Sequence, residues 1–196
     1  YYSYRKEGNK EKENELIKTS ENIWIISCLL FLLVSLFSPP LIRLFTPISY
    51  HNASNLIWIL SLGFLFNILW ILFGAEIFYS KKTYWHTFIT LISSVLSLSF
   101  IFLFVDVWGV YAIVTGMTIW WISYSILGIF IASKIHSRPV NIFFYIYSFV
   151  ITLLLSSSYF IFKLYLINDL IIIIINIFIT LLFLLINKEK YISLIK

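Results

Sequence analysis

Six long apolar segments joined by short polar turns constrain the fold of this chain more than any other feature. Each is close to the about 20 residues that an α-helix needs to cross the hydrocarbon core of a bilayer. None alternates apolar and polar residues as a membrane β-strand does. The sequence therefore predicts an all-α polytopic membrane bundle of six transmembrane helices. The expected spans run from about residue 22 to 38, 55 to 78, 85 to 105, 110 to 133, 141 to 162 and 169 to 186.

The composition excludes a water-soluble domain. The 196-residue chain is 61% hydrophobic and only 12% charged, whereas a soluble domain is about 25% charged. A soluble fold of this length could not hide so much apolar surface, because the buried fraction of a chain rises only slowly with its length. We therefore expect a lipid bilayer as partner. The single cysteine, Cys28, lies inside an apolar run, which excludes an intramolecular disulfide and a cysteine metal site.

Three regions are expected along the chain. Residues 1–21 carry closely spaced Lys, Arg and Glu, a pattern typical of a solvated helix or loop, and we interpret them as a cytoplasmic connector. Residues 22–187 form the six-span bundle, and residues 188–196 form a cytoplasmic tail. The first residue is a tyrosine and no signal peptide is visible, so we expect the C-terminal part of a longer transporter.

The basic residues predict the orientation of the bundle. With six spans, alternate connections share a side, and one side then takes 12 of the 14 Lys and Arg residues, including Lys81 and Lys82. The other side holds only Arg43 and Lys163. Because basic residues near span ends stay cytoplasmic, both termini are predicted to be cytoplasmic. The net charge of +5 thus lies at span ends, where it is an orientation signal, and we expect no nucleic-acid partner.

Several residue types predict local details of the helices. The first span meets Pro39-Pro40, and we expect its helix to continue, kinked, toward Phe45. Small and hydroxylated residues in the third and fourth spans predict close helix contacts and interhelical hydrogen bonds. These are Ser93, Ser94, Ser97, Ser99, Gly116, Ser123 and Gly128. The sixth span contains an unbroken run of isoleucines, Ile171 to Ile175, and is expected to be peripheral and lipid-facing.

Asparagines and tryptophans add expectations about depth. Asn67 and Asn176 lie in mid-span, where an amide usually bonds a neighbouring helix. Four tryptophans fall near expected span ends, where an indole prefers the headgroup region: Trp24, Trp58, Trp85 and Trp108. Three fall deeper and are expected to pack between helices or to face lipid: Trp70, Trp120 and Trp121.

No pattern for catalysis, metal or cofactor binding is present in the sequence. The histidines His51, His86 and His136 fall in loops or at span ends and on different faces, so a shared metal site is not expected. There is no phosphate-binding loop, dinucleotide fingerprint or zinc-protease motif. No nucleophile stands at a usable spacing from a base. We expect neither an enzyme nor a cofactor.

Charged residues beside the membrane are the better functional candidates. Glu76 precedes Lys81 by five residues, which places it about 7 Å deeper along a helix. It would either belong to an inner gate or extend to the interface beside Lys81 and Lys82. Arg43 would either meet an anionic substrate group or anchor in the headgroups. These four residues are the candidates for the substrate path or gate.

The order of these features resembles the C-terminal part of bacterial polysaccharide flippases, the O-antigen and repeat-unit transporters of the multidrug/oligosaccharidyl-lipid/polysaccharide exporter superfamily. The resemblance covers residues 1–135 and consists in the order and spacing of these sequence features. Family members often carry a second glycine where Ala112 stands, and small residues where Ile113 and Val114 stand. The features are the charged connector, SPPLIRLF at residues 38–45, FGAE before the lysine turn at residues 73–76, and DVWGVYA at residues 106–112.

The resemblance implies spans nine to fourteen of a fourteen-span protein of the bacterial inner membrane. It implies alternating access between two helical bundles, which moves a polyprenyl-pyrophosphate-linked oligosaccharide across the membrane for surface polysaccharide synthesis. The coupling ion would be a proton or sodium, and most substrate-binding residues would lie in earlier spans. The alternatives are a multidrug or lipid II exporter of the same superfamily, a polytopic enzyme of envelope polysaccharide synthesis, and a non-catalytic scaffold. An enzyme is expected to carry a large polar loop, and the longest loop here spans only residues 46–54.

Overall fold

The computed structural model of this chain describes residues 10–135, 142–164 and 169–187. At some of these positions, including Glu76 and Lys163, only the backbone is described. The tail from residue 188, the first nine residues of the connector, His136 and Arg138 lie outside the described residues.

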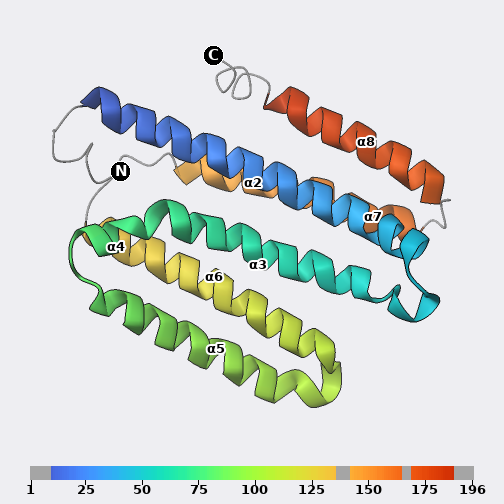
Figure 1. The fold of residues 1–196 in the computed structure, drawn as a ribbon, viewed down its shortest axis with the longest axis horizontal. Coiled ribbons are helices and arrows are strands. Elements are labelled where there is room, and N and C mark those ends of the chain that lie inside the picture. Colours follow the sequence, from blue (N-terminus) through green and yellow to red (C-terminus); the bar gives the residue numbers. More distant parts are fainter. Residues whose placement is uncertain (1–9, 136–141, 165–168, 188–196) are drawn as a thin grey trace. The chain divides into compact units, whose positions relative to one another are not determined.

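Every secondary-structure element of the described residues is a helix, so the predicted all-α class is confirmed (Figure 1). Four stretches are long and apolar enough to cross a membrane, namely Asn14–Phe45, Ile48–Tyr79, Tyr84–Trp108 and Val110–Ile135. Two further helices contain shorter apolar stretches, so a count of six spans stays a prediction. The elements are α2 (Lys10–Phe45), the 3-10 helix η1 (Ile48–Tyr50), α3 (Ala53–Phe73), α4 (Ala75–Tyr79), α5 (Tyr84–Trp108), α6 (Val110–Ile135), α7 (Ile142–Leu164) and α8 (Asp169–Ile186).

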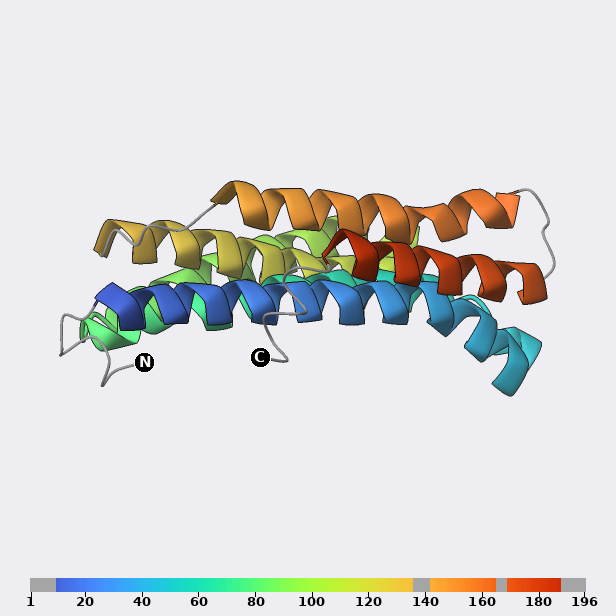
Figure 2. The ribbon, with the colours of Figure 1, turned by 90° about the horizontal axis from the view of Figure 1, so that it is seen from above.

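Helix α2 continues without a break from the charged connector into the apolar span. It contains Pro39 and Pro40 and ends at Phe45, which confirms the prediction that the helix passes through the double proline. Proline lacks a backbone N–H, and its ring crowds the carbonyl four residues earlier. Figure 2 shows the consequence, because the last turns of α2 leave the axis of the rest of the helix.

The chain divides into two compact units. The first unit contains α2, α7 and α8. The second contains α3 from Trp58 onward, together with α4, α5 and α6. Each unit has its own interhelical contacts, and we describe them in turn.

In the first unit, α2 packs against α7 through a buried polar seam. Trp24 is buried, its Nε1 donates to Ser148 Oγ over 2.8 Å, and its ring centroid lies 5.8 Å from that of Tyr145. One turn further along both helices, the Cys28 thiol lies in hydrogen-bond contact with Thr152. The contacts advance together along α2 and α7, so the two helices are parallel. The expectation of a headgroup-facing Trp24 is wrong, because its indole finds a buried acceptor on a neighbouring helix.

Helix α8 lies against α2 and runs in the opposite direction (Figure 1). One face of α8 is buried and carries Asn176, Ile179 and Phe183. The other face exposes large apolar side chains such as Ile174 and Phe178. The sixth apolar segment therefore exposes apolar side chains on one side only, and its contact with lipid stays a prediction. The predicted role of Asn176 is confirmed, because its Nδ2 donates to a backbone carbonyl of α2.

In the second unit, α5 and α6 form an antiparallel hairpin that turns at Gly109 (φ 52°). Ser97 Oγ donates to the Gly116 carbonyl over 2.7 Å, and Trp120 Nε1 donates to Ser94 Oγ over 3.1 Å. The predicted interhelical role of these residues is confirmed. It is wrong for Ser99, which is exposed, and for Ser123, whose hydroxyl donates to carbonyls of its own helix.

Helices α3 and α6 are parallel and are joined by two hydroxyl-to-carbonyl bonds. Thr118 Oγ1 donates to the Ile59 carbonyl over 2.9 Å, and Ser125 Oγ donates to the Phe66 carbonyl over 2.6 Å. Donors and acceptors are both spaced by seven residues, which is close to two helical turns. The two bonds therefore recur on one face of each helix.

The outward face of α5 is mostly apolar. Phe102, Leu103 and Val107 are 75%, 74% and 78% exposed in the protein alone. Water does not favour such a surface, whereas lipid tails do, so the apolar helices fit association with a bilayer.

The sequence predicts that successive connections between helices lie on alternate sides of the membrane. Within each unit, the directions of the helices agree with this alternation. In the second unit, the end of α4, the start of α5 and the end of α6 lie at one end, with Lys81, Lys82 and Lys134. In the first unit, α2 and α7 run in the same direction and α8 runs in the opposite one. Which of these ends faces the cytoplasm stays a prediction.

Candidate functional site

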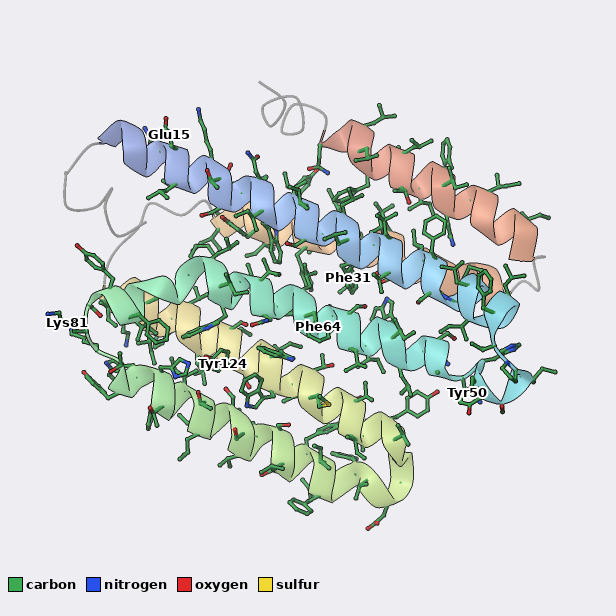
Figure 3. The ribbon with its side chains drawn as sticks, in the orientation of Figure 1. Glu15, Phe31, Tyr50, Phe64, Lys81 and Tyr124 are labelled. Atoms are coloured by element: carbon green, nitrogen blue, oxygen red, sulfur yellow. The ribbon has the colours of Figure 1, made fainter. Side chains whose placement is uncertain are left out.

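The lysine turn between α4 and α5 has a defined backbone geometry. Lys81 adopts a left-handed conformation (φ 57°), its N–H donates to the Phe78 carbonyl, and the N–H of Lys82 donates to the Ile77 carbonyl. This pair of bonds is the Schellman motif, which ends a helix by satisfying its last carbonyls. Both lysine side chains are exposed, so the motif presents two positive charges at the end of the second unit (Figure 3).

The other two predicted site residues lie elsewhere. The backbone of Glu76 belongs to α4, the short helix that precedes the lysine turn, and its side chain is not described. Arg43 lies in the last turn of α2, beyond the double proline, and is half-buried. Arg43 belongs to the first unit and the other three candidates to the second. Their roles in a substrate path or gate stay predictions.

Trp70 is the centre of a cluster that the sequence reasoning missed. Its ring lies against two glycines: an added Cβ would come within 2.8 Å of the ring at Gly74 and within 2.3 Å at Gly128. Gly74 also separates α3 from α4, so the chain changes direction where the indole needs room. Glycine is the residue that lets a large ring approach the backbone this closely.

His86 completes this cluster from the start of α5. Its Nε2 lies 2.7 Å from the Tyr124 hydroxyl, and its ring centroid lies 5.6 Å from Trp70 and 5.2 Å from Phe78. Tyr124 is buried, 4.4 Å from Trp70, and stacks on Trp120 with an interplanar angle of 10°. We call Trp70, Phe78, His86, Trp120 and Tyr124 the aromatic–histidine cluster.

The aromatic–histidine cluster holds both ends of the lysine turn. Phe78 precedes Lys81 on α4, and His86 follows Lys82 on α5. Both rings pack on Trp70, in contacts of the tilted and edge-to-face kinds that aromatic groups favour. The turn is thus clamped between two helices, and its charges project from a fixed base. Chemically, this arrangement can present positive charge to an anionic group at the end of a helical membrane unit.

The sequence contained a weak signal for this cluster. His86 was interpreted as an interfacial residue, and its partner Tyr124 is 38 residues away. Trp70 was expected to pack between helices, which is confirmed, but its two glycine neighbours lie on different segments. The signal that could have found the site is the pairing of Gly74 and Gly128 with a mid-span tryptophan.

Among the described residues, the remaining polar groups form no second chemical centre. His51 follows η1, and its Nε2 lies 3.2 Å from the Thr46 carbonyl of the same loop. Over the stretches that the structure describes, no three His, Cys, Asp or Glu side chains are placed to hold a metal ion. The candidate functional site is therefore the lysine turn on its aromatic–histidine cluster. No protein-family model, curated protein or solved structure matches this chain.

Proposed function

We propose that this chain is the C-terminal part of a bacterial inner-membrane flippase that moves a polyprenyl-pyrophosphate-linked oligosaccharide for surface polysaccharide synthesis. The proposal rests on the resemblance in the order of features over residues 1–135. It is supported by an all-helical structure with several helices long and apolar enough to span a membrane.

The observation that carries the proposal is the lysine turn. Lys81 and Lys82 are exposed at the end of the second unit, and the Schellman motif and the aromatic–histidine cluster fix the backbone that bears them. A pyrophosphate-linked lipid carries its negative charge at the membrane surface, where fixed positive charges attract it. In the proposed orientation this end faces the cytoplasm, where such a substrate would be made.

Gene inactivation in the host tests the function. The flippase proposal expects loss of surface polysaccharide while the lipid-linked oligosaccharide is still made and accumulates. Absence of the lipid-linked oligosaccharide itself would favour a biosynthetic enzyme. Unchanged polysaccharide with new drug sensitivity would favour a multidrug exporter, and arrest of peptidoglycan synthesis would favour a lipid II exporter. Each of these three results would overturn the proposal.

Complementation with variants tests the site. Lys81→Gly with Lys82→Ser keeps a turn that glycine favours and removes both charges, and we expect export to fall severalfold at unchanged protein level. Lys81→Arg with Lys82→Arg is the matched control, which retains the charges. Full restoration by a Glu76→Ala, Arg43→Ala double variant would show that these two charges are only anchors. Full restoration by the charge-free turn would remove the lysines from the substrate path.

Cysteine labelling tests the orientation separately. Ile48→Cys places an exposed thiol in η1, and Lys82→Cys places one in the lysine turn. The proposal expects a membrane-impermeant maleimide to reach the first thiol in intact spheroplasts and the second only after permeabilisation. The reverse pattern would place the lysine turn outside and would contradict the proposed orientation.

A further inference from the structure

The double proline in α2 removes two backbone donors at a point where the helix is buried. In an α-helix each N–H bonds the carbonyl four residues earlier, so Pro39 and Pro40 leave the carbonyls of Ser35 and Leu36 without their usual partners. Ser35 and Leu36 are 2% and 0% exposed. In apolar surroundings an unsatisfied backbone carbonyl costs several kcal/mol, so the freed groups need donors from elsewhere.

Helix α8 supplies one of these donors. Asn176 Nδ2 donates to the Leu36 carbonyl over 2.6 Å, although the two residues are 140 positions apart. Asn176 is itself 0% exposed. The acceptor is the carbonyl that Pro40 would have bonded if it had carried an N–H. The side-chain amide therefore stands in for the missing backbone donor.

Asn176 is held in this position by the buried face of α8. Ile179 and Phe183 follow it at three and seven residues, a spacing that keeps all three on one side of a helix. All three are buried. The burial of these three residues holds the amide against α2, and a shift of α8 away from α2 would separate it from the Leu36 carbonyl.

We propose that Asn176 is a latch that couples the docking of α8 to the bend at the end of α2. Undocking of α8 leaves both the amide and the Leu36 carbonyl without partners. Straightening of α2 draws the same carbonyl away from the amide. The bent form of α2 and the docked form of α8 are thus stabilised together, whatever substrate the protein carries.

A double-mutant cycle on the full chain in detergent micelles tests the coupling. Asn176→Leu keeps the branched shape and the number of side-chain heavy atoms and removes the donor. An interhelical hydrogen bond in a membrane protein contributes about 0.6 kcal/mol on average and about 1.7 at most, so the unfolding equilibrium constant is expected to rise about 3- to 20-fold. Pro40→Ala restores the backbone N–H, and in this background Asn176→Leu is expected to cost nothing or to stabilise. The equilibrium is measured by titration with sodium dodecyl sulfate and tryptophan fluorescence.

Pro39→Ala is the matched control, because it restores the donor for Ser35 and not for Leu36. The latch expects Asn176→Leu to keep its full cost in the Pro39→Ala background. An equal cost of Asn176→Leu in the wild-type and Pro40→Ala backgrounds would overturn the proposal. Equal rescue by both alanine substitutions would also overturn it, since a general loosening of the bend would then explain the effect.

Spin-label distances provide a readout of the bend itself. Labels at Glu15→Cys and Leu44→Cys, both exposed positions, report on the two ends of α2 in a Cys28→Ala background. Asn176→Leu is expected to broaden the distance distribution, and the added Pro40→Ala to narrow it around a longer distance. An unchanged distribution in the Asn176→Leu variant would show that the amide does not hold the bend.

Discussion

Replacing Gly128 with alanine is expected to destabilise the second unit through a clash with Trp70. The added Cβ would lie 2.3 Å from two atoms of the indole ring, whereas ordinary carbon contacts begin at about 3.5 Å. The ring would have to move by about 1.2 Å to restore such a contact. It has little room to do so, because Gly74 backs it on one side and the Tyr124 ring lies 4.4 Å away on another.

The expected cost follows from three contributions. Overpacking in a filled core costs about 1 to 3 kcal/mol, and a displaced indole forfeits about 0.5 to 1.5 kcal/mol of ring contact. Alanine recovers up to about 1 kcal/mol through its higher helix propensity. The net loss is therefore about 2 kcal/mol, which is about a 30-fold rise in the unfolding equilibrium constant.

The assay is unfolding of the purified chain by sodium dodecyl sulfate in mixed micelles, followed by circular dichroism. Gly63→Ala is the matched control in the same pair of helices, because its Cβ would meet Trp121 at 3.1 Å and the Thr118 backbone at 3.3 Å. We expect this control to cost less than about 1 kcal/mol. A Trp70→Leu background should abolish the cost of Gly128→Ala. The reasoning is refuted if Gly128→Ala is as harmless as the control, or is equally costly beside Trp70→Leu.

Three further predictions test the backbone, the helix contacts and the buried seam. Lys81→Gly should stabilise the chain by about 0.5 kcal/mol, because the left-handed conformation of a non-glycine residue costs about 1 kcal/mol. Lys81→Val should destabilise the chain. Equal midpoints of the two variants in unfolding titrations would contradict this prediction. Thr118→Val and Ser125→Ala should each lower the free energy of unfolding by about 0.6 kcal/mol. The two losses should add in the double variant, because the bonds lie about 10 Å apart along the helix. Strongly non-additive losses would be inconsistent with separate bonds. The Cys28 thiol, 0% exposed, should react with a maleimide far more slowly in micelles than after denaturation, and Trp24→Phe should speed the reaction by loosening the seam; fast labelling of the unaltered protein would contradict its burial.

Much of the architecture could be predicted because the bilayer imposes simple rules. Span length and hydropathy predicted the helices, and the missing donors of Pro39-Pro40 predicted a distorted helix that still reaches Phe45. Hydroxyl groups in apolar segments predicted interhelical bonds, and those of Ser94 and Ser97 are present. The predictions from span length and from the double proline succeed because they depend on local chemistry alone. The interhelical prediction is wrong for Ser99 and Ser123, because the partner of a hydroxyl depends on which helix faces meet.

The partners of these groups could not be predicted, because they depend on which faces meet. Asn176 was expected to bond a neighbouring helix, but nothing local to α8 selects the Leu36 carbonyl as its acceptor. The missing N–H of Pro40 would have suggested the Leu36 carbonyl as the acceptor, since a freed carbonyl in lipid needs a donor. The position of Trp24 could not be predicted for a different reason, because an indole N–H finds a partner either in the headgroup region or in a buried hydroxyl. The neighbouring helices decide which of the two it meets.

The unbroken course of α2 has a mechanical consequence. The straight part of α2 before the double proline, residues 10–38, spans about 44 Å at about 1.5 Å per residue, whereas a hydrocarbon core of about 30 Å accommodates about 32 Å at a tilt of about 20°. About 12 Å of helix, or about eight residues, therefore extends beyond the hydrocarbon core, and the charged residues from Lys10 onward suit that position. Since no break separates this part from the span, it acts as a lever arm. A change of about 10° in the tilt of the span would move its charged tip by about 2 Å.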